Sequence, residues 1–170
     1  MNDNKIYIRV ATGHDRETLR GMLVRSSPES IYRRFHIPYS EVPEWMLSLM
    51  LDTDRLDKEN VVAVAEDKIV GHAMYVRLED DTEAEMAIIV EDRWQSMGVG
   101  KSLFLELAQR ARLRDVETFT VEVLRQNRPM LGLAAVFPRT DYATVDGMCR
   151  VRISLQTPVP AGRQLRPALL

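Results

Sequence analysis

Gln95-Ser96-Met97-Gly98-Val99-Gly100-Lys101-Ser102 is the most informative stretch of this chain, because of what stands on either side of it. The apolar run at 86–90, Met-Ala-Ile-Ile-Val, precedes it and predicts a strand. After it, apolar residues recur at the spacing of one helix face: Val99, Leu103, Phe104, Leu107, Ala108 and Ala111. The segment is therefore predicted to be a strand, a loop with two glycines, and the N-terminus of a helix.

This order is suited to binding a phosphate group. Gly98 and Gly100 allow the backbone to approach a ligand closely, because neither carries a Cβ atom. The free N–H groups of the first helical turn and the helix dipole both favour a negative charge there. Lys101 and Ser102 add a positive charge and a hydroxyl group at the same place.

Two widespread nucleotide-binding loops do not match this segment. A Walker loop, G-x-x-x-x-G-K-[ST], requires its first glycine at position 95, which is Gln95. A dinucleotide fingerprint, G-x-G-x-x-G, requires a glycine at position 103, which is Leu103. The sequence therefore predicts a phosphate loop of another kind.

The composition is that of an ordinary globular protein. The chain has 170 residues, of which 45% are hydrophobic and 28% are charged. We expect one domain over residues 1–156 and a flexible tail with three prolines at 157–170. The net charge of −2 gives no reason to expect nucleic acid or an anionic membrane as a partner, and nothing indicates an oligomeric state.

Cysteine and histidine usage bear on compartment and metal binding. The single cysteine, Cys149, excludes an internal disulfide and a cysteine metal cluster, and it fits a reducing cytoplasm. The N-terminus lacks the apolar core of a signal peptide, and no apolar run reaches the ~18 residues of a membrane span. Three scattered histidines show no metal-binding spacing. We therefore expect a cytoplasmic protein without a bound metal.

The rest of the chain alternates between strand and helix patterns. Strands are expected at 5–10, 61–66, 69–77, 83–90, 118–124 and 151–155, and helices at 15–25, 28–35, 99–115, 128–136 and one opening at Pro43. Ser27 and Asn127 are expected to cap the helices that follow them. We also expect a loop at 52–60, a hairpin turn at Asp67-Lys68, and burial of Trp45, Met46, Leu49 and Met50.

The loop and its context resemble a known family. The pattern Q/R-x-x-G-x-G/A, present here as Gln95 to Gly100, resembles the pyrophosphate loop of acyl-CoA-dependent N-acyltransferases of the GNAT superfamily. Three segments also resemble bacterial protein lysine acetyltransferases of the Pat type. They are Ser-Pro-Glu-Ser-Ile-Tyr-x-Arg-Phe at 27–35, Ala-Glu-Met-Ala-x-x-Val-x-Asp-x-Trp-Gln at 84–95, and Glu-Val-Leu-x-x-Asn-Arg-x-Met at 122–130.

This resemblance implies an α/β (α+β) fold from about residue 5 to 155, with a mixed, mostly antiparallel sheet that splits in the middle. It also implies an acetyl-CoA-dependent N-acetyltransferase whose acceptor is a protein lysine. One departure is visible. Many GNAT members end the late helix with Tyr-x-x-x-Gly-Phe, and the stretch ending in Val136-Phe137-Pro138 has neither that tyrosine nor that glycine.

Acyl transfer to an amine needs a group that removes the amine proton. Period-two alternation places Glu83 and Glu85 on the same face of the predicted strand 83–90. Glu85 matches the acidic position of the Pat-type pattern and is our predicted general base, acting through water, with Glu83 as the reserve candidate. If the sheet splits near Val90, the backbone groups of Ile88 and Val90 become free for the pantetheine arm and the thioester carbonyl.

The predicted acetyl-CoA site therefore consists of Ile88, Val90, Gln95, Met97, Gly98, Val99, Gly100, Lys101, Ser102 and Asn127. Tyr32, Arg34, Phe35 and His36 are expected in the wall of the acceptor site. Two alternatives stay open at this point. The acceptor is a small amine instead of a protein lysine, or the chain is an acyl-CoA-binding regulatory module without turnover.

Overall fold

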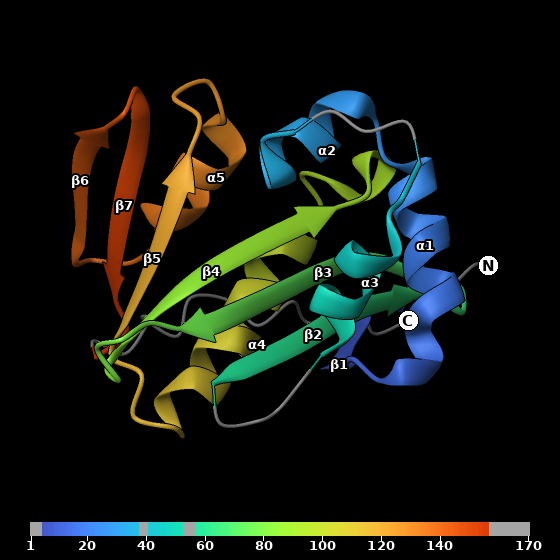
Figure 1. Ribbon diagram of the computed structural model, residues 1–170, viewed down its shortest axis with the longest axis horizontal. Helices are drawn as coiled ribbons and strands as arrows, with labels where there is room; N and C mark the ends of the chain where they lie inside the picture. Colours follow the sequence, from blue (N-terminus) through green and yellow to red (C-terminus); the bar gives the residue numbers. More distant parts are fainter. Residues whose placement is uncertain (1–4, 38–40, 53–56, 157–170) are drawn as a thin grey trace, which may run out of the picture.

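A computed structural model describes residues 5–37, 41–52 and 57–156 (Figure 1). The predicted flexible tail at 157–170 lies outside the described residues. The described chain folds around a seven-stranded sheet with the strand order β1-β2-β3-β4-β5-β7-β6. Its strands are β1 Tyr7–Val10, β2 Lys58–Ala65, β3 Lys68–Arg77, β4 Glu83–Val90, β5 Thr118–Val123, β6 Thr140–Val145 and β7 Met148–Ser154.

The sheet is mixed and mostly antiparallel, with β4 and β5 as its parallel pair. These two strands pair only at their beginnings, from Glu83 opposite Thr118 to Glu85 opposite Thr120. Beyond that point they diverge, and Figure 1 shows the opening between them as a V. The predicted fold class, including the split in the sheet, is confirmed.

Helices cover both faces of the sheet. Helix α4, Val99–Arg112, lies behind the sheet in Figure 1, and its apolar face joins the larger hydrophobic core with β2 to β5. Helices α1, Arg16–Arg25, and α3, Glu44–Leu51, cover the other face and form a second, smaller core. Helices α2, Pro28–Phe35, and α5, Arg128–Ala134, lie on the two sides of the V.

The short helices beside the V begin where the sequence predicts. The Ser27 side chain accepts a hydrogen bond from the Ser30 N–H and so caps α2, with Pro28 at the first helical position. The Asn127 side chain caps α5 in the same way by accepting from the Met130 N–H. Both caps fix the start of a helix that faces the opening.

Helix α3 buries a different stripe from the predicted one. Trp45 is 57% exposed and Leu49 is 38% exposed, so the prediction that both are buried is wrong. The helix begins at Glu44 and turns Met46, Leu47, Met50 and Leu51 toward the core. Met46 and Met50 are buried as predicted, but their buried neighbours are Leu47 and Leu51 instead of Trp45 and Leu49.

Two other predictions need correction, and one strand was missed. Strand β2 begins at Lys58, inside the predicted loop 52–60. The tight turn between β2 and β3 consists of Glu66 and Asp67, both with positive φ, while Lys68 already pairs with Ala65. Strand β6 was not predicted. It pairs with β7 through a turn at Asp146 and Gly147, an Asp-Gly signal that favours a hairpin.

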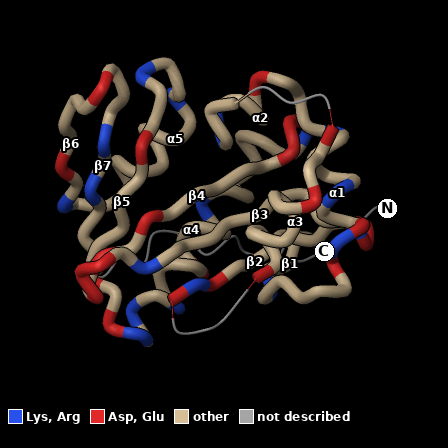
Figure 2. The backbone as a smooth tube through the Cα atoms, viewed as in Figure 1, with Lys and Arg blue, Asp and Glu red and all other residues tan. Residues whose placement is uncertain are grey.

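Charge is unevenly placed on the sheet. Figure 2 shows that the middle of β3 and β4 is free of charged residues, and that acidic residues lie toward both ends of β4. Across the described residues, no helix has both the length and the apolar character needed to span a bilayer.

Candidate active site

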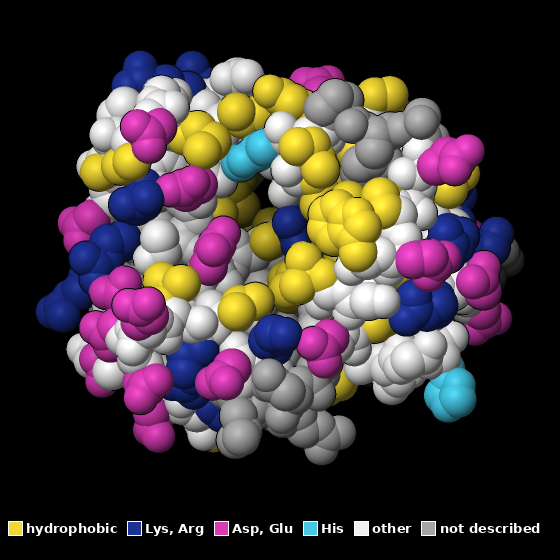
Figure 3. Space-filling view, in the orientation of Figure 1, with side chains coloured by type: hydrophobic (Ala, Val, Ile, Leu, Met, Phe, Trp, Pro, Cys, Tyr) yellow, Lys and Arg dark blue, Asp and Glu magenta, His cyan; other side chains and the backbone are white. Residues whose placement is uncertain are grey.

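A cavity of about 660 Å³ occupies the V between β4 and β5. Side chains from both faces of β4 line it, including Glu85 and Ala87 from one face and Met86 and Ile88 from the other. The cavity therefore passes through the split instead of lying on one side of the sheet. Figure 3 shows the corresponding hollow in the molecular surface.

The glycine-containing loop forms one end of this cavity. Gly98 has φ 84°, a left-handed conformation that disfavours residues with a Cβ atom. The backbone hydrogen bond from Ser102 N–H to Gly98 O opens α4, so the N–H groups of Val99, Gly100 and Lys101 have no acceptor within this described helix. Gly98, Gly100 and Lys101 all line the cavity, which leaves a cradle for an anionic group.

Other predicted loop residues lie away from the cavity. The Val99 side chain is buried in the larger core, so only its backbone N–H can reach a ligand. Met97 is 53% exposed, and neither it nor Ser102 belongs to the cavity lining.

Gln95 lines the cavity but uses its side-chain amide inside the protein. The Nε2 atom donates to Ser30 Oγ at 3.0 Å and to the Val90 carbonyl at 2.9 Å. An amide nitrogen has two hydrogens, and both are engaged by these bonds. The Gln95 side chain therefore holds the loop in place and has no donor left for a phosphate.

The last residues of β4 turn backbone groups toward the split. The Glu91 N–H donates to the Val70 carbonyl at 2.9 Å, which continues the β3–β4 register one residue beyond the strand. Backbone groups alternate between the two sides of a strand, so those of Ile88 and Val90 face away from β3. At these positions β5 has already diverged. The backbone groups of Ile88 and the Val90 N–H therefore face the split as expected, whereas the Val90 carbonyl accepts from Gln95 Nε2 at 2.9 Å and is not free.

Glu85 and Glu83 share a face of β4 but have different surroundings. Glu85 is exposed and lines the cavity, and its carboxylate has no ion-pair partner among the residues that the structure describes. Glu83 lies one pleat farther from the opening, where its carboxylate pairs with Arg152. The geometry thus favours Glu85 over Glu83 as the group available for proton transfer.

A second cavity of about 430 Å³ adjoins the first. It is lined by Leu78, Glu83, Glu85, Thr120, Glu122, Arg150 and Arg152. Glu85 and Glu122 line both cavities and therefore mark where the two meet. Glu122 accepts from the Arg150 guanidinium at 2.6 Å. Its place in the site was not predicted, because nothing in the sequence says that β5 brings it to the same cavities as Glu85.

The C-terminal half of α2 forms one wall of the large cavity. Arg34, Phe35 and His36 line it as expected, and Arg33 joins them. Tyr32 is exposed and absent from the lining, so its expected place in the wall is wrong. The Arg34 guanidinium lies over the Phe35 ring, 4.6 Å from its centre, and donates to the Met74 sulfur at 3.3 Å.

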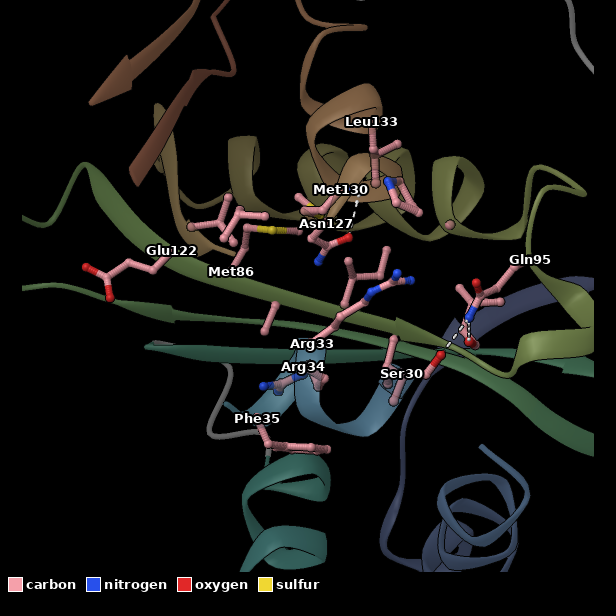
Figure 4. Close-up of a pocket in the computed structure, with 18 of the residues that line it drawn as sticks. Ser30, Arg33, Arg34, Phe35, Met86, Gln95, Glu122, Asn127, Met130 and Leu133 are labelled. Atoms are coloured by element: carbon pink, nitrogen blue, oxygen red, sulfur yellow. Dashed lines mark hydrogen bonds between the residues drawn. The ribbon is translucent and has the colours of Figure 1, made fainter. Parts of the chain in front are cut away.

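Figure 4 shows the arrangement along the cavity, with Gln95 at one end and Glu122 at the other. Asn127 lies between them on the α5 side, where it also caps the helix. The exposed Trp45 lines the cavity from α3. It was missed because the predicted apolar stripe had assigned it to the core. No group of side chains in the described ranges is arranged to hold a metal ion.

Comparisons with known proteins agree with this geometry. The GNAT domain of S. lividans PAT is 26% identical, with a TM-score of 0.81 over 86% of this chain and 89% of that chain. PaiA N-acetyltransferase from Thermoplasma acidophilum, solved with coenzyme A, is 18% identical and has a TM-score of 0.68 over 88% and 99%.

A third similar structure is YncA, a putative acetyltransferase from Salmonella typhimurium solved with acetyl-CoA. It is 14% identical and has a TM-score of 0.70, covering 90% of this chain and 95% of that chain. These last two likenesses concern the fold alone. A family model described as Acetyltransferase (GNAT) family matches residues 25–136, which include α2, the split strands and the glycine loop. The chain belongs to the Acetyltransferase (GNAT) family.

Proposed function

We propose that this protein transfers an acetyl group from acetyl-CoA to a protein lysine by direct attack, with Glu85 as the general base. The observation that carries the proposal is the position of Glu85, where a cavity ending in a phosphate cradle meets a second cavity. Acetyl-CoA supplies the acetyl group as a thioester. Two similar structures, PaiA N-acetyltransferase and YncA, are described as complexes with coenzyme A and acetyl-CoA.

The cavity has groups suited to each part of this cosubstrate. The N–H groups at the start of α4, together with Lys101, suit the pyrophosphate. The backbone groups of Ile88 and the N–H of Val90 suit the amides of the pantetheine arm, whereas the Val90 carbonyl already accepts from Gln95. The Ile88 N–H also suits the thioester oxygen, because a backbone donor aimed at a developing negative charge lowers the barrier to acyl transfer.

Glu85 supplies the proton-transfer step. A lysine amine has an ordinary pKa near ~10.4 and must lose a proton before it can attack. In the proposed reaction the Glu85 carboxylate accepts that proton through a water molecule. The amine nitrogen then bonds to the acetyl carbon and the carbon–sulfur bond breaks. The nitrogen loses its second proton as the amide forms, and that proton passes through water to the sulfur as coenzyme A leaves. The described residues include no tyrosine among the lining of the large cavity to deliver that last proton.

One feature favours a protein lysine as the acceptor, and a second suits any cationic amine. The indole of Trp45 lines the cavity and is largely exposed, so it offers an apolar surface at the mouth for a long side chain. Three carboxylates, those of Glu83, Glu85 and Glu122, line the second cavity with two arginines, and only Glu85 lacks an arginine partner among the residues in the structure. An unpaired carboxylate there favours the approach of a cationic amine.

The base assignment is tested by Glu85→Gln, with Glu83→Gln as the matched control on the same face. We expect Glu85→Gln to bind acetyl-CoA normally and to lose roughly 10²–10⁴-fold in turnover, because the amide cannot accept the proton. Glu83→Gln breaks an ion pair outside the large cavity and should be mild. Calorimetric titration and thiol release measure the two properties. A large loss of turnover in Glu83→Gln with a small loss in Glu85→Gln would assign the general base to Glu83 instead.

The acceptor class is tested by competition between amines. With acetyl-CoA saturating, the purified protein should acetylate lysines of cellular proteins faster than polyamines, aminoglycosides or free amino acids. Mass spectrometry of the products gives the ranking. The reverse ranking would leave the assignment as an acetyltransferase unchanged, but would show that the acceptor is a small amine and not a protein lysine. Coenzyme A binding without turnover on any amine would leave only a binding module.

A further inference from the structure

Helix α2 is joined to the segment after β4 by a dense set of hydrogen bonds. The Asp92 carboxylate accepts from the Ser27 N–H at 2.7 Å, the Ser27 hydroxyl at 2.6 Å and the Ser30 hydroxyl at 2.8 Å. Burial opposes ionisation of Asp92, but the hydrogen bonds from Ser27 and Ser30 outweigh it and lower the pKa of this carboxyl below its usual value. A charged acceptor therefore anchors the first turn of α2.

The same hydroxyl continues the chain to the glycine loop. Ser30 Oγ donates to Asp92 and accepts from Gln95 Nε2 at 3.0 Å, and its residue is only 6% exposed. Gln95 also donates to the Val90 carbonyl at the end of β4. Figure 4 shows Ser30 and Gln95 joined at the end of the cavity. The direction of donation is thus Gln95 to Ser30 to Asp92, with Ser30 as the link.

The two segments joined by this chain serve different parts of the site. Gln95 begins the loop that leads to the cradle at Gly98 and Gly100. Helix α2 carries Phe35 and the arginines at 33 and 34 into the cavity wall, eight residues or fewer from its cap. A shift of either segment breaks a buried hydrogen bond, so neither moves independently of the other.

We propose that Ser30 is a positioning residue that couples the acetyl-CoA loop to the α2 wall. Acetyl-CoA binding then orders α2, and an ordered α2 strengthens acetyl-CoA binding by the same factor, because coupling between two sites is reciprocal. Ser30 needs no contact with either substrate for this effect. The inference rests on acetyl-CoA binding at the cradle, and it holds for any acceptor amine.

The affinity test uses coenzyme A itself as the ligand. Ser30→Ala should weaken coenzyme A binding about tenfold by calorimetry, because it leaves a Gln95 donor without its acceptor. Gln95→Met removes the same bond from the other side and should weaken binding similarly. The double variant should lose less than the sum of the two single losses, because both single variants break the same Gln95–Ser30 bond and each breaks one further bond of its own. Ser30→Thr keeps a hydroxyl and should restore most of the affinity, and Ser48→Ala on the exposed face of α3 should match the wild type.

A second readout separates coupling from a local defect. In the wild-type protein, saturating coenzyme A should slow amide hydrogen exchange both in the loop at 96–101 and in α2. In Ser30→Ala at saturating coenzyme A, the loop should stay protected while α2 exchanges as in the free protein. Equal protection of α2 in both proteins would overturn the proposal, as would additive losses in the double variant. Neither experiment requires turnover. The proposal for Ser30 can therefore be tested even if the protein binds coenzyme A without transferring an acetyl group.

Discussion

His72 is completely buried on β3. Its Nε2 atom is 2.8 Å from the Met50 carbonyl and 3.0 Å from Asn60 Oδ1. Both neighbours are acceptors, so the tautomer with a proton on Nε2 satisfies them. Burial, with a smaller contribution from the nearby Arg34 charge, lowers the pKa of His72 to about 3. The imidazole is therefore neutral and ties the end of α3 to β2 and β3.

This depressed pKa predicts a pH-dependent stability. The unfolded chain takes up a proton on His72 below its ordinary pKa of 6.5, whereas the folded protein does not until about pH 3. Stability should therefore fall as the pH drops through this window, by about 2 kcal/mol between pH 7 and pH 5. Urea denaturation at the two pH values measures the change.

The control for that experiment is His72→Gln, which keeps a donor for the Met50 carbonyl but has no proton to gain. The variant should lose most of the pH dependence between pH 5 and 7, whatever its stability at pH 7. The same slope in both proteins would assign the effect to another group.

The two carboxylates of β4, Glu83 and Glu85, cannot be ranked as the general base from sequence alone. Strand alternation predicts that Glu83 and Glu85 share a face, and they do. Alternation says nothing about the Arg152 side chain that pairs with Glu83, because β7 lies far along the chain and reaches this place only through the fold. The choice between the two carboxylates therefore depends on tertiary structure.

At the scale of elements, the strongest local signals predicted the fold best. Helix α2 has its predicted bounds, because a serine cap and a proline at the first position fix its start. Strand β4 also has its predicted bounds. Strand β6 was missed although Asp146-Gly147 signals a hairpin, because its residues are mostly exposed and give little apolar alternation.

The candidate site was predictable to the extent that it depends on local backbone. Gly98, Gly100 and the start of α4 follow from a loop between a strand and a helix. The contribution of Trp45 from α3, and the pairing of Gln95 with Ser30, join residues that are distant in sequence. No spacing rule connects such residues, so only the assembled molecule reveals them.

The molecule as a whole is built from two parts that separate at the V. Strands β4 and β5 share only a short parallel pairing from Glu83 to Glu85. An aromatic cluster joins the parts below the opening: the Phe104 ring on α4 lies 5.9 Å from that of Phe119 on β5 and 4.5 Å from that of Phe137 after α5. The hydrophobic core thus joins the two parts at the base of the V.

A ligand that fills the V bridges the two parts, so coenzyme A should stabilise the whole protein against unfolding. At about 100 times the Kd, binding adds ~2.7 kcal/mol, which corresponds to a rise in Tm of roughly 5–10 °C for a chain of this size. Gly100→Val is the control. A Cβ at Gly100 would lie 3.7 Å from Val90 Cγ2, an ordinary contact, so the variant should fold while its side chain fills the cradle. Its Tm should stay constant as coenzyme A is added. Differential scanning calorimetry measures both values of Tm. If coenzyme A raised the Tm of Gly100→Val as much as that of the wild type, it would bind outside the V.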